Sequence, residues 1–234
     1  MERRELALAA VFTALVCVAT MSIQVYIPAT RGYFNVGEVM VYTAALLLGA
    51  RLGAVAGGVG SALADLLTGY VVYAPATLVI KGCEGFIVGW LSRRLLKLSS
   101  RAGFPMSAVL GSFAGIAVWF MGTRFYVGEA ELSIGSWTYI IFASEEVWIA
   151  MAVAVFAIVV LLGFLARLPS GVQALAVLVG GAVMVSGYFL YEAALFGVAV
   201  AAVEVPFNVF QALIGLLISL PLVNALKKAL PEFP

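Results

Sequence analysis

The chain has 234 residues, of which 64% are hydrophobic and 11% are charged, with a formal net charge of +1. Soluble domains carry roughly 25% charged residues, so this composition excludes a water-soluble globule and indicates a polytopic α-helical membrane protein. A near-neutral chain without basic runs interleaved with aromatics gives no reason to expect a nucleic-acid partner.

Eight apolar segments follow one another along the chain, and each is predicted to cross the bilayer as a helix. A crossing needs about 20 apolar residues, so the shorter second segment is expected to be tilted or partly re-entrant. No cleaved leader is expected, because no small-residue cleavage site follows the first apolar run. The predicted segments are 6–27, 36–50, 52–70, 74–91, 106–125, 137–165, 172–191 and 203–226.

Lysine and arginine residues set the expected orientation of the chain. With the N-terminus in the cytoplasm, ten of them fall on the cytoplasmic side, and only Arg31 and Arg124 fall outside. This asymmetry predicts eight crossings of the cell membrane with both termini in the cytoplasm. The ten residues are Arg3, Arg4, Arg51, Arg93, Arg94, Lys97, Arg101, Arg167, Lys227 and Lys228.

Polar side chains interrupt the apolar segments, most densely between residues 34 and 90. A charged group inside a bilayer is costly and indicates a functional site. On the expected topology these side chains lie in the outer half of the membrane, which predicts an outward-opening pocket for a small polar solute. The predicted substrate-binding residues are Asn35, Glu38, Asp65, Lys81, Glu84, Tyr188, Asn208 and Gln211.

Several of these residues also have a purely structural interpretation. Lys81 and Glu84 are three positions apart on one helix, so they either form a structural ion pair or contact the ligand. Asp65 either caps the end of its helix or contacts the ligand. Glu38, expected near the outer face, is either a first-turn carboxylate that the helix dipole stabilises or a ligand-binding residue. Asn35 is either the N-cap of that helix or a ligand-binding residue.

The later spans leave similar alternatives. Tyr188 either stacks on a planar ring or belongs to the interfacial aromatic belt. The amides of Asn208 and Gln211 either read the hydrogen-bonding edge of a heterocycle or bond to a neighbouring helix. Glu192 and Glu204 border an outer loop and are expected to be solvated.

Catalytic and metal-binding patterns are absent from the sequence. The chain has no histidine, and Cys17 and Cys83 fall within predicted spans as buried thiols, so no metal, cofactor or disulfide is expected. Glu145 and Glu146 are adjacent, and adjacent helical residues do not face each other, so they form no acid–base pair alone. Without a phosphate-binding loop the chain is not expected to hydrolyse ATP or to be an enzyme.

Small residues recur at a spacing of four in several spans and predict close helix packing. The patterns are Gly53-xxx-Gly57, Gly85-xxx-Gly89, Gly111-xxx-Gly115 and Ala10-xxx-Ala14.

Four stretches together resemble the substrate-binding S component of energy-coupling factor (ECF) vitamin transporters. They are FNVGEVMVYTAALLLGARLGAVAGGVGSALADLLTGY, APATLVIKGCEGFIVGWLSRR, GGAVMVSGYFLYEAALFG and VEVPFNVFQALIGLLISLPLVNALKK. The resemblance implies a six-helix bundle that binds a vitamin or precursor near the outer face, under a lid formed here by residues 28–35. It also implies a transmembrane coupling subunit, contacted by Ala10 and Ala14, and two ATPase subunits.

The chain departs from that family by two added apolar segments within residues 105–170. We therefore expect one all-α membrane domain with a core of residues 1–104 and 171–234 and an inserted helical pair, whose role is to widen the pocket, cover a flank or alter docking. The expected function is ATP-driven uptake of riboflavin, a pyrimidine-like precursor or another vitamin. A stand-alone carrier or channel is the alternative, and an intramembrane enzyme lacks a catalytic base.

Overall fold

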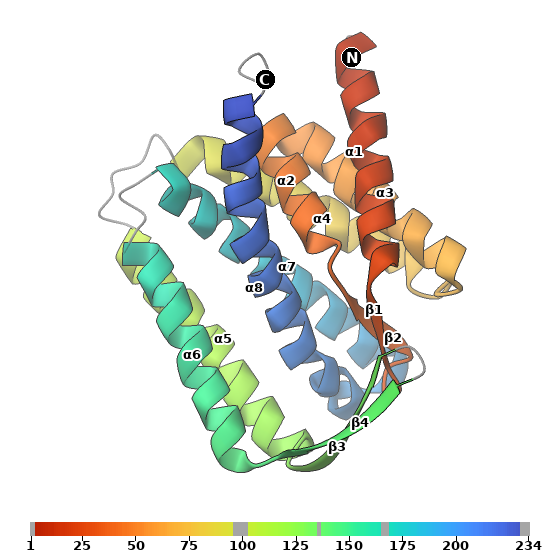
Figure 1. Cartoon of the computed structure of the whole chain (residues 1–234), viewed down its shortest axis with the longest axis vertical. Coiled ribbons are helices and arrows are strands. Elements are labelled where there is room, and N and C mark those ends of the chain that lie inside the picture. The colour runs from red at the N-terminus through yellow and green to blue at the C-terminus, as the bar shows by residue number, and fades with distance from the viewer. Residues whose placement is uncertain (1–2, 96–102, 135–136, 165–168, 230–234) are drawn as a thin grey trace.

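The computed structural model describes residues 3–95, 103–134, 137–164 and 169–229, which form helices and two short hairpins (Figure 1). The helices are α1 (Arg3–Ser22), α2 (Glu38–Leu48), α3 (Ala50–Thr68), α4 (Ala74–Leu95), α5 (Gly103–Phe125), α6 (Glu145–Phe164), α7 (Pro169–Phe196) and α8 (Val198–Ala229). The strands are β1 (Gln24–Ile27), β2 (Gly32–Asn35), β3 (Gly128–Ile134) and β4 (Trp137–Ala143). Strand β1 pairs with β2 and β3 pairs with β4, both antiparallel.

The predicted all-α membrane bundle is confirmed, with the two hairpins added to it. In the described part of the chain, six helices are long and apolar enough to cross a bilayer, namely α1, α3, α4, α5, α7 and α8. Helix α2 has 11 residues, about 16 Å of rise, which is shorter than a hydrocarbon core of about 30 Å. The expected shortness of the second segment is therefore confirmed, whereas the number of crossings and the cytoplasmic placement of both termini remain predictions.

The sixth predicted segment, 137–165, is wrong at its start. Residues 137–143 form strand β4, and α6 begins only at Glu145. The run Trp-Thr-Tyr-Ile-Ile-Phe combines β-branched and aromatic residues, which fit a pleated strand, and its apolar character alone does not distinguish strand from helix. Glu145 and Glu146 consequently occupy the exposed first turn of α6, and lie outside the interior of a span.

A glycine separates α2 from α3. Gly49 has φ +85°, a conformation that residues with a Cβ adopt at a cost, and its N–H donates to the Ala45 carbonyl at 2.9 Å. The break lets α3 begin immediately at Ala50, and α2 is left enclosed by α3, α4 and α8.

Helices α3 and α4 pack with their backbones in contact at the predicted glycine positions. A Cβ added to Gly85 would lie 2.4 Å from the Gly53 carbonyl oxygen, and one added to Gly89 would lie 2.5 Å from the Ala50 nitrogen. The close packing predicted from the small-residue pattern is confirmed here, and the glycines at 111 and 115 likewise face the backbone of α6.

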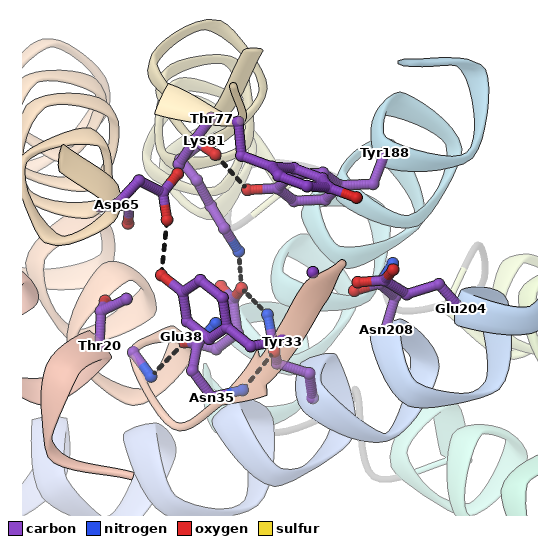
Figure 2. Close-up of a pocket in the computed structure, with 15 residues that line it drawn as sticks. Thr20, Tyr33, Asn35, Glu38, Asp65, Thr77, Lys81, Tyr188, Glu204 and Asn208 are labelled. Atoms are coloured by element: carbon purple, nitrogen blue, oxygen red, sulfur yellow. Dashed lines mark hydrogen bonds and ion pairs between the residues drawn. The ribbon is translucent and has the colours of Figure 1, made fainter. Parts of the chain in front are cut away.

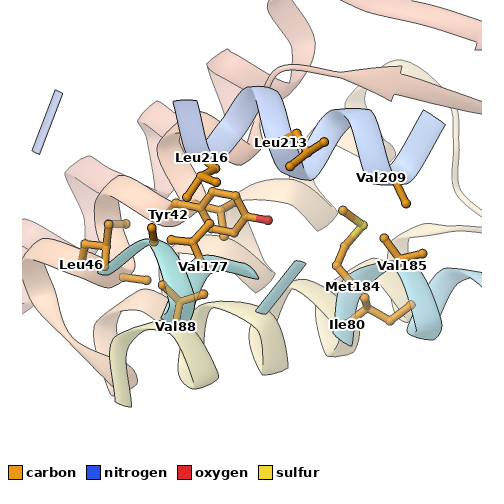
Figure 3. Close-up of a cluster of buried hydrophobic side chains, with 14 of the residues drawn as sticks. Tyr42, Leu46, Ile80, Val88, Val177, Met184, Val185, Val209, Leu213 and Leu216 are labelled. Atoms are coloured by element: carbon orange, nitrogen blue, oxygen red, sulfur yellow. The ribbon is translucent and has the colours of Figure 1, made fainter. Parts of the chain in front are cut away.

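Apolar side chains fill the centre of the bundle between α2, α4, α7 and α8 (Figure 3). Tyr42 and Leu216 are among the largest fully buried side chains in this cluster. The start of α1 and the end of α8 lie at one end of the bundle, whereas both hairpins lie at the opposite end (Figure 1). Cys17 is buried as predicted, but Cys83 is exposed on the outside of α4.

Candidate functional site

A polar pocket lies between the β1–β2 hairpin and the helices at the end of the bundle away from the termini (Figures 1 and 2). Strand β2 covers it, and α1, α2, α3, α4, α7 and α8 each contribute to its walls. The lining residues are Thr20, Gly32, Tyr33, Asn35, Gly37, Glu38, Ser61, Asp65, Tyr73, Thr77, Lys81, Tyr188, Glu204, Asn208 and Gln211.

A buried ion cluster forms the base of the pocket. The Lys81 ammonium contacts Glu38 Oε1 and lies 3.2 Å from Glu84 Oε2, and all three side chains are at most 4% exposed. Tyr42 donates to Glu84 Oε1 at 2.8 Å. Lys81 therefore pairs with two carboxylates at once. Glu38 lines the pocket, whereas Glu84 does not and lies on the side of Lys81 away from the pocket.

The hairpin is tied to α8 through Gln211. The Gln211 amide donates to Glu38 Oε1 at 2.9 Å, and its carbonyl oxygen accepts from the Asn35 N–H at 2.9 Å. Gly37, not Asn35, is the N-cap of α2, and Asn35 Oδ1 instead accepts from the Gly37 N–H at 2.8 Å. The alternative in which Asn35 caps α2 is therefore wrong.

Tyr33 fastens the hairpin to α3 from the other side. Its hydroxyl donates to Asp65 Oδ1 at 2.6 Å. Burial, followed by the negative charge of Asp65, raises the pKa of the Tyr33 hydroxyl, so the group remains a donor at neutral pH. The end of α3 is capped by the Gly69 N–H bonding to the Asp65 backbone carbonyl, so the Asp65 side chain does not serve as the cap.

Replacing Tyr33 with phenylalanine is expected to loosen the hairpin over the pocket. The hydrogen bond to a carboxylate contributes about 1.5–3 kcal/mol, so a bound ligand should dissociate about tenfold faster or more. Stopped-flow or surface-based dissociation rates measure this, with Tyr26→Phe as the control because Tyr26 is half exposed on the neighbouring strand. Equal rates for the two variants would show that Tyr33 does not hold the hairpin closed.

Tyr188 and Asn208 face the pocket from α7 and α8 (Figure 2). The Tyr188 hydroxyl donates to Thr77 Oγ1 at 3.0 Å, and its ring lies 5.7 Å from Lys81 Nζ. This position excludes the interfacial-belt interpretation of Tyr188. Asn208 is 5% exposed, and within the described residues its amide makes no hydrogen bond, which leaves it available to a ligand.

Glu192 and Glu204 are buried, so the expectation that they are solvated is wrong. They are 0% and 4% exposed, and Glu204 lines the pocket while Glu192 lies behind it. The physical reason is the connection between α7 and α8, which is the single residue Gly197. Glu204 therefore lies well inside α8, with Tyr73 and Thr30 closing over the two carboxyl groups.

Seven of the eight predicted binding residues line this one pocket, and Glu84 is the exception. The sequence prediction missed Thr20, Tyr33 and Tyr73, and it also missed three polar residues that lie four positions before predicted ones, on the same helix face. Ser61 precedes Asp65, Thr77 precedes Lys81, and Glu204 precedes Asn208. The four-residue spacing was the available signal. No residue of α5 or α6 with a described side chain lines the pocket.

Comparison with known proteins identifies the family. The model of the family described as "ECF-type riboflavin transporter, S component" matches residues 1–168, which is more than half of the chain. The chain belongs to this family. It is therefore a multi-pass protein of the plasma membrane from a family of transporter subunits, and the resemblance noted in the sequence is confirmed.

Two curated relatives match parts of this S component. An uncharacterized protein in gap 3'region of Pyrococcus woesei is 54% identical over 78 residues, 33% of this chain and 52% of the relative. The thiamine precursor transporter HmpT of Lactococcus lactis subsp. cremoris (strain MG1363) is 33% identical over 107 residues, 43% of this chain and 64% of the relative. The chain thus spans about half to just under two-thirds of these relatives.

Ala10 and Ala14 lie on the exposed side of α1. Helix α1 is on the flank of the bundle opposite α5 and α6 (Figure 1). A stripe of small side chains lets another helix approach closely, so the S component presents a surface suited to helix packing there.

Proposed function

We propose that this S component binds a vitamin or vitamin precursor in the pocket beneath the β1–β2 hairpin and delivers it to an ATP-driven importer. The observation that supports this is the convergence of polar side chains from seven separate elements on one buried, hairpin-covered pocket. Burying so many polar groups in a membrane protein costs free energy, so their presence together indicates a functional site.

The chemistry of the walls suits a heterocyclic solute. Tyr33 and Tyr188 offer aromatic faces, and the amide of Asn208 offers both a donor and an acceptor for a ring edge, while Gln211 is engaged by Glu38 and Asn35. Riboflavin fits the name of the matching family, and a pyrimidine precursor fits the name of one curated relative.

Transport is proposed to require partners. The sequence has no phosphate-binding loop, so ATP hydrolysis is proposed to take place on partner subunits, which the family resemblance implies are two ATPases. The transmembrane coupling subunit is proposed to pack on α1 at Ala10 and Ala14, on the opposite flank from α5 and α6. The pocket and the coupling surface would then be separate regions of one bundle.

Ligand capture by the purified protein tests the proposed function. Mass spectrometry of the protein isolated from cells should find a bound vitamin-like molecule, and at least one member of a vitamin panel should raise the unfolding temperature. Asn208→Leu should abolish that shift, because the free amide is lost at nearly constant volume, whereas Asn224→Leu, outside the pocket on the same helix, should preserve it.

Two outcomes contradict the proposal. The absence of both a copurified molecule and any thermal shift across the panel would remove the vitamin-binding role. Uptake by vesicles that contain this chain alone would favour the stand-alone carrier instead.

A further inference from the structure

The charges around the pocket do not balance. Its lining contains three carboxylates, Glu38, Asp65 and Glu204, and one ammonium, Lys81. Lys81 is already paired with Glu38 and with Glu84 behind it. The described residues thus leave no free cation in the pocket for an anionic ligand, and two carboxylates, Asp65 and Glu204, remain without a cationic partner.

Glu204 is the carboxylate best placed to meet a ligand. It is 4% exposed, and its Oε2, like Asp65 Oδ2, has no hydrogen-bond partner among the described residues. Asp65 is held through its other oxygen by Tyr33, whereas no tyrosine donates to Glu204 in the described part of the chain. Its carboxyl group points from α8 into the pocket (Figure 2). A buried carboxylate oxygen without a donor is costly, and a donor on the ligand would remove that cost.

Glu192 places a second buried acid beside Glu204. Its buried carboxyl group lies against that of Glu204, and neither forms a salt bridge with any described residue. Two buried carboxyl groups in contact share a proton, and with that proton on Glu192 the Glu204 group is left as the acceptor of the pair, able to accept a further hydrogen bond from a ligand.

Asn208 stands one helical turn beyond Glu204 on the same face of α8 and also lines the pocket. An ionised carboxylate can only accept hydrogen bonds, from N–H or O–H donors, whereas an amide both donates and accepts. Side by side, the two groups match a ring edge on which an exocyclic amino group neighbours a ring nitrogen.

We propose that Glu204 and Asn208 read an exocyclic amino group of a heterocyclic ligand, so that the pocket selects amino-substituted rings over oxo-substituted and phosphorylated ones. This specificity rests on the proposed vitamin-binding function. An oxo group would place its acceptor oxygen against the Glu204 carboxylate, and a phosphate would enter a pocket in which the one ammonium of the described lining is already paired.

The test measures three probes on the purified full chain by titration calorimetry. They are the 4-aminopyrimidine precursor of thiamine, its 4-oxo counterpart and its phosphate ester. The wild type should prefer the amino ring over the oxo ring by on the order of 100-fold or more, because a site built for a donor rejects a ring without one. The phosphate ester should bind more weakly than the amino ring. Equal or stronger binding of the oxo ring or the ester would overturn the proposal without any variant.

Glu204→Gln then assigns the selectivity to its residue. The glutamine amide can donate to an oxo group, so the amino-over-oxo preference should fall below about tenfold. The control Glu145→Gln, an exposed glutamate on α6, should retain the full preference. A full preference retained by Glu204→Gln but lost in Asp65→Asn would overturn the assignment to Glu204.

Failure of this inference is distinguishable from failure of the proposed function. If the wild type binds riboflavin, which lacks a primary amino group, and none of the pyrimidines, vitamin binding stands and amino-group selection is wrong. If no vitamin in the wider panel binds, both are wrong.

Discussion

Replacing Lys81 with methionine is expected to destabilise the protein more than any other single polar substitution in the pocket. The change removes the one cation that pairs with both Glu38 and Glu84, and those carboxylates are 1% and 0% exposed. Removing one partner of a buried ion pair costs about 3–5 kcal/mol, because the remaining charge stays buried without compensation. The midpoint of unfolding in detergent measures the loss.

A combined variant separates charge from packing. Glu38→Gln/Lys81→Met/Glu84→Gln removes the charges together, so it should recover at least half of the stability lost in Lys81→Met. Lys227→Met, in the exposed last turn of α8, serves as the matched control. A loss for Lys81→Met no larger than that control would show that the cluster does not stabilise the bundle.

Introducing tryptophan at Ala10 or Ala14 is expected to abolish transport while ligand binding remains unchanged. Both residues are on the exposed side of α1 and neither lines the pocket, so a bulky side chain blocks the approach of another helix without reaching the ligand. Vitamin uptake by vesicles that contain the full transporter and binding by the isolated chain are the two measurements.

The matched control for this prediction is Ala154→Trp. Ala154 is an exposed alanine on α6, on the flank away from α1 (Figure 1), so transport should continue. Loss of ligand binding in both α1 variants would place the pocket, rather than the partner surface, at this face. Full transport in both would remove the coupling role of α1.

The sequence predicted which residues line the pocket better than how far from the outer face they lie. Charged and amide residues stand out in apolar spans, so Asp65, Lys81, Asn208 and Gln211 were identifiable from the residue pattern alone. Glu38 was expected near the outer face, yet it pairs with Lys81, seven residues into α4, or about 10 Å. The hairpin carries the chain inward before α2 begins, and residue periodicity does not report such a descent.

Two other features depended on tertiary context. Glu204 was predicted to be solvated because hydropathy placed the start of the last span at residue 203, next to a loop. The helix in fact begins at Val198, so Glu204 lies inside it. Residues 137–143 looked like the start of a span because strands and helices can share an apolar run, and pairing with β3 decides between them. In both cases the deciding partner lies elsewhere in the chain.

The packed cluster beneath the ion cluster has a consequence for the route of a solute. Below Glu84 and Tyr42, the space between α2, α4, α7 and α8 is occupied by buried aliphatic side chains (Figure 3). In the described part of the chain this packed cluster lies between the pocket and the end of the bundle where the termini are. Release of a solute on the far side would therefore require the whole bundle to tilt or its helices to move apart, and we propose that the partner subunits drive that movement.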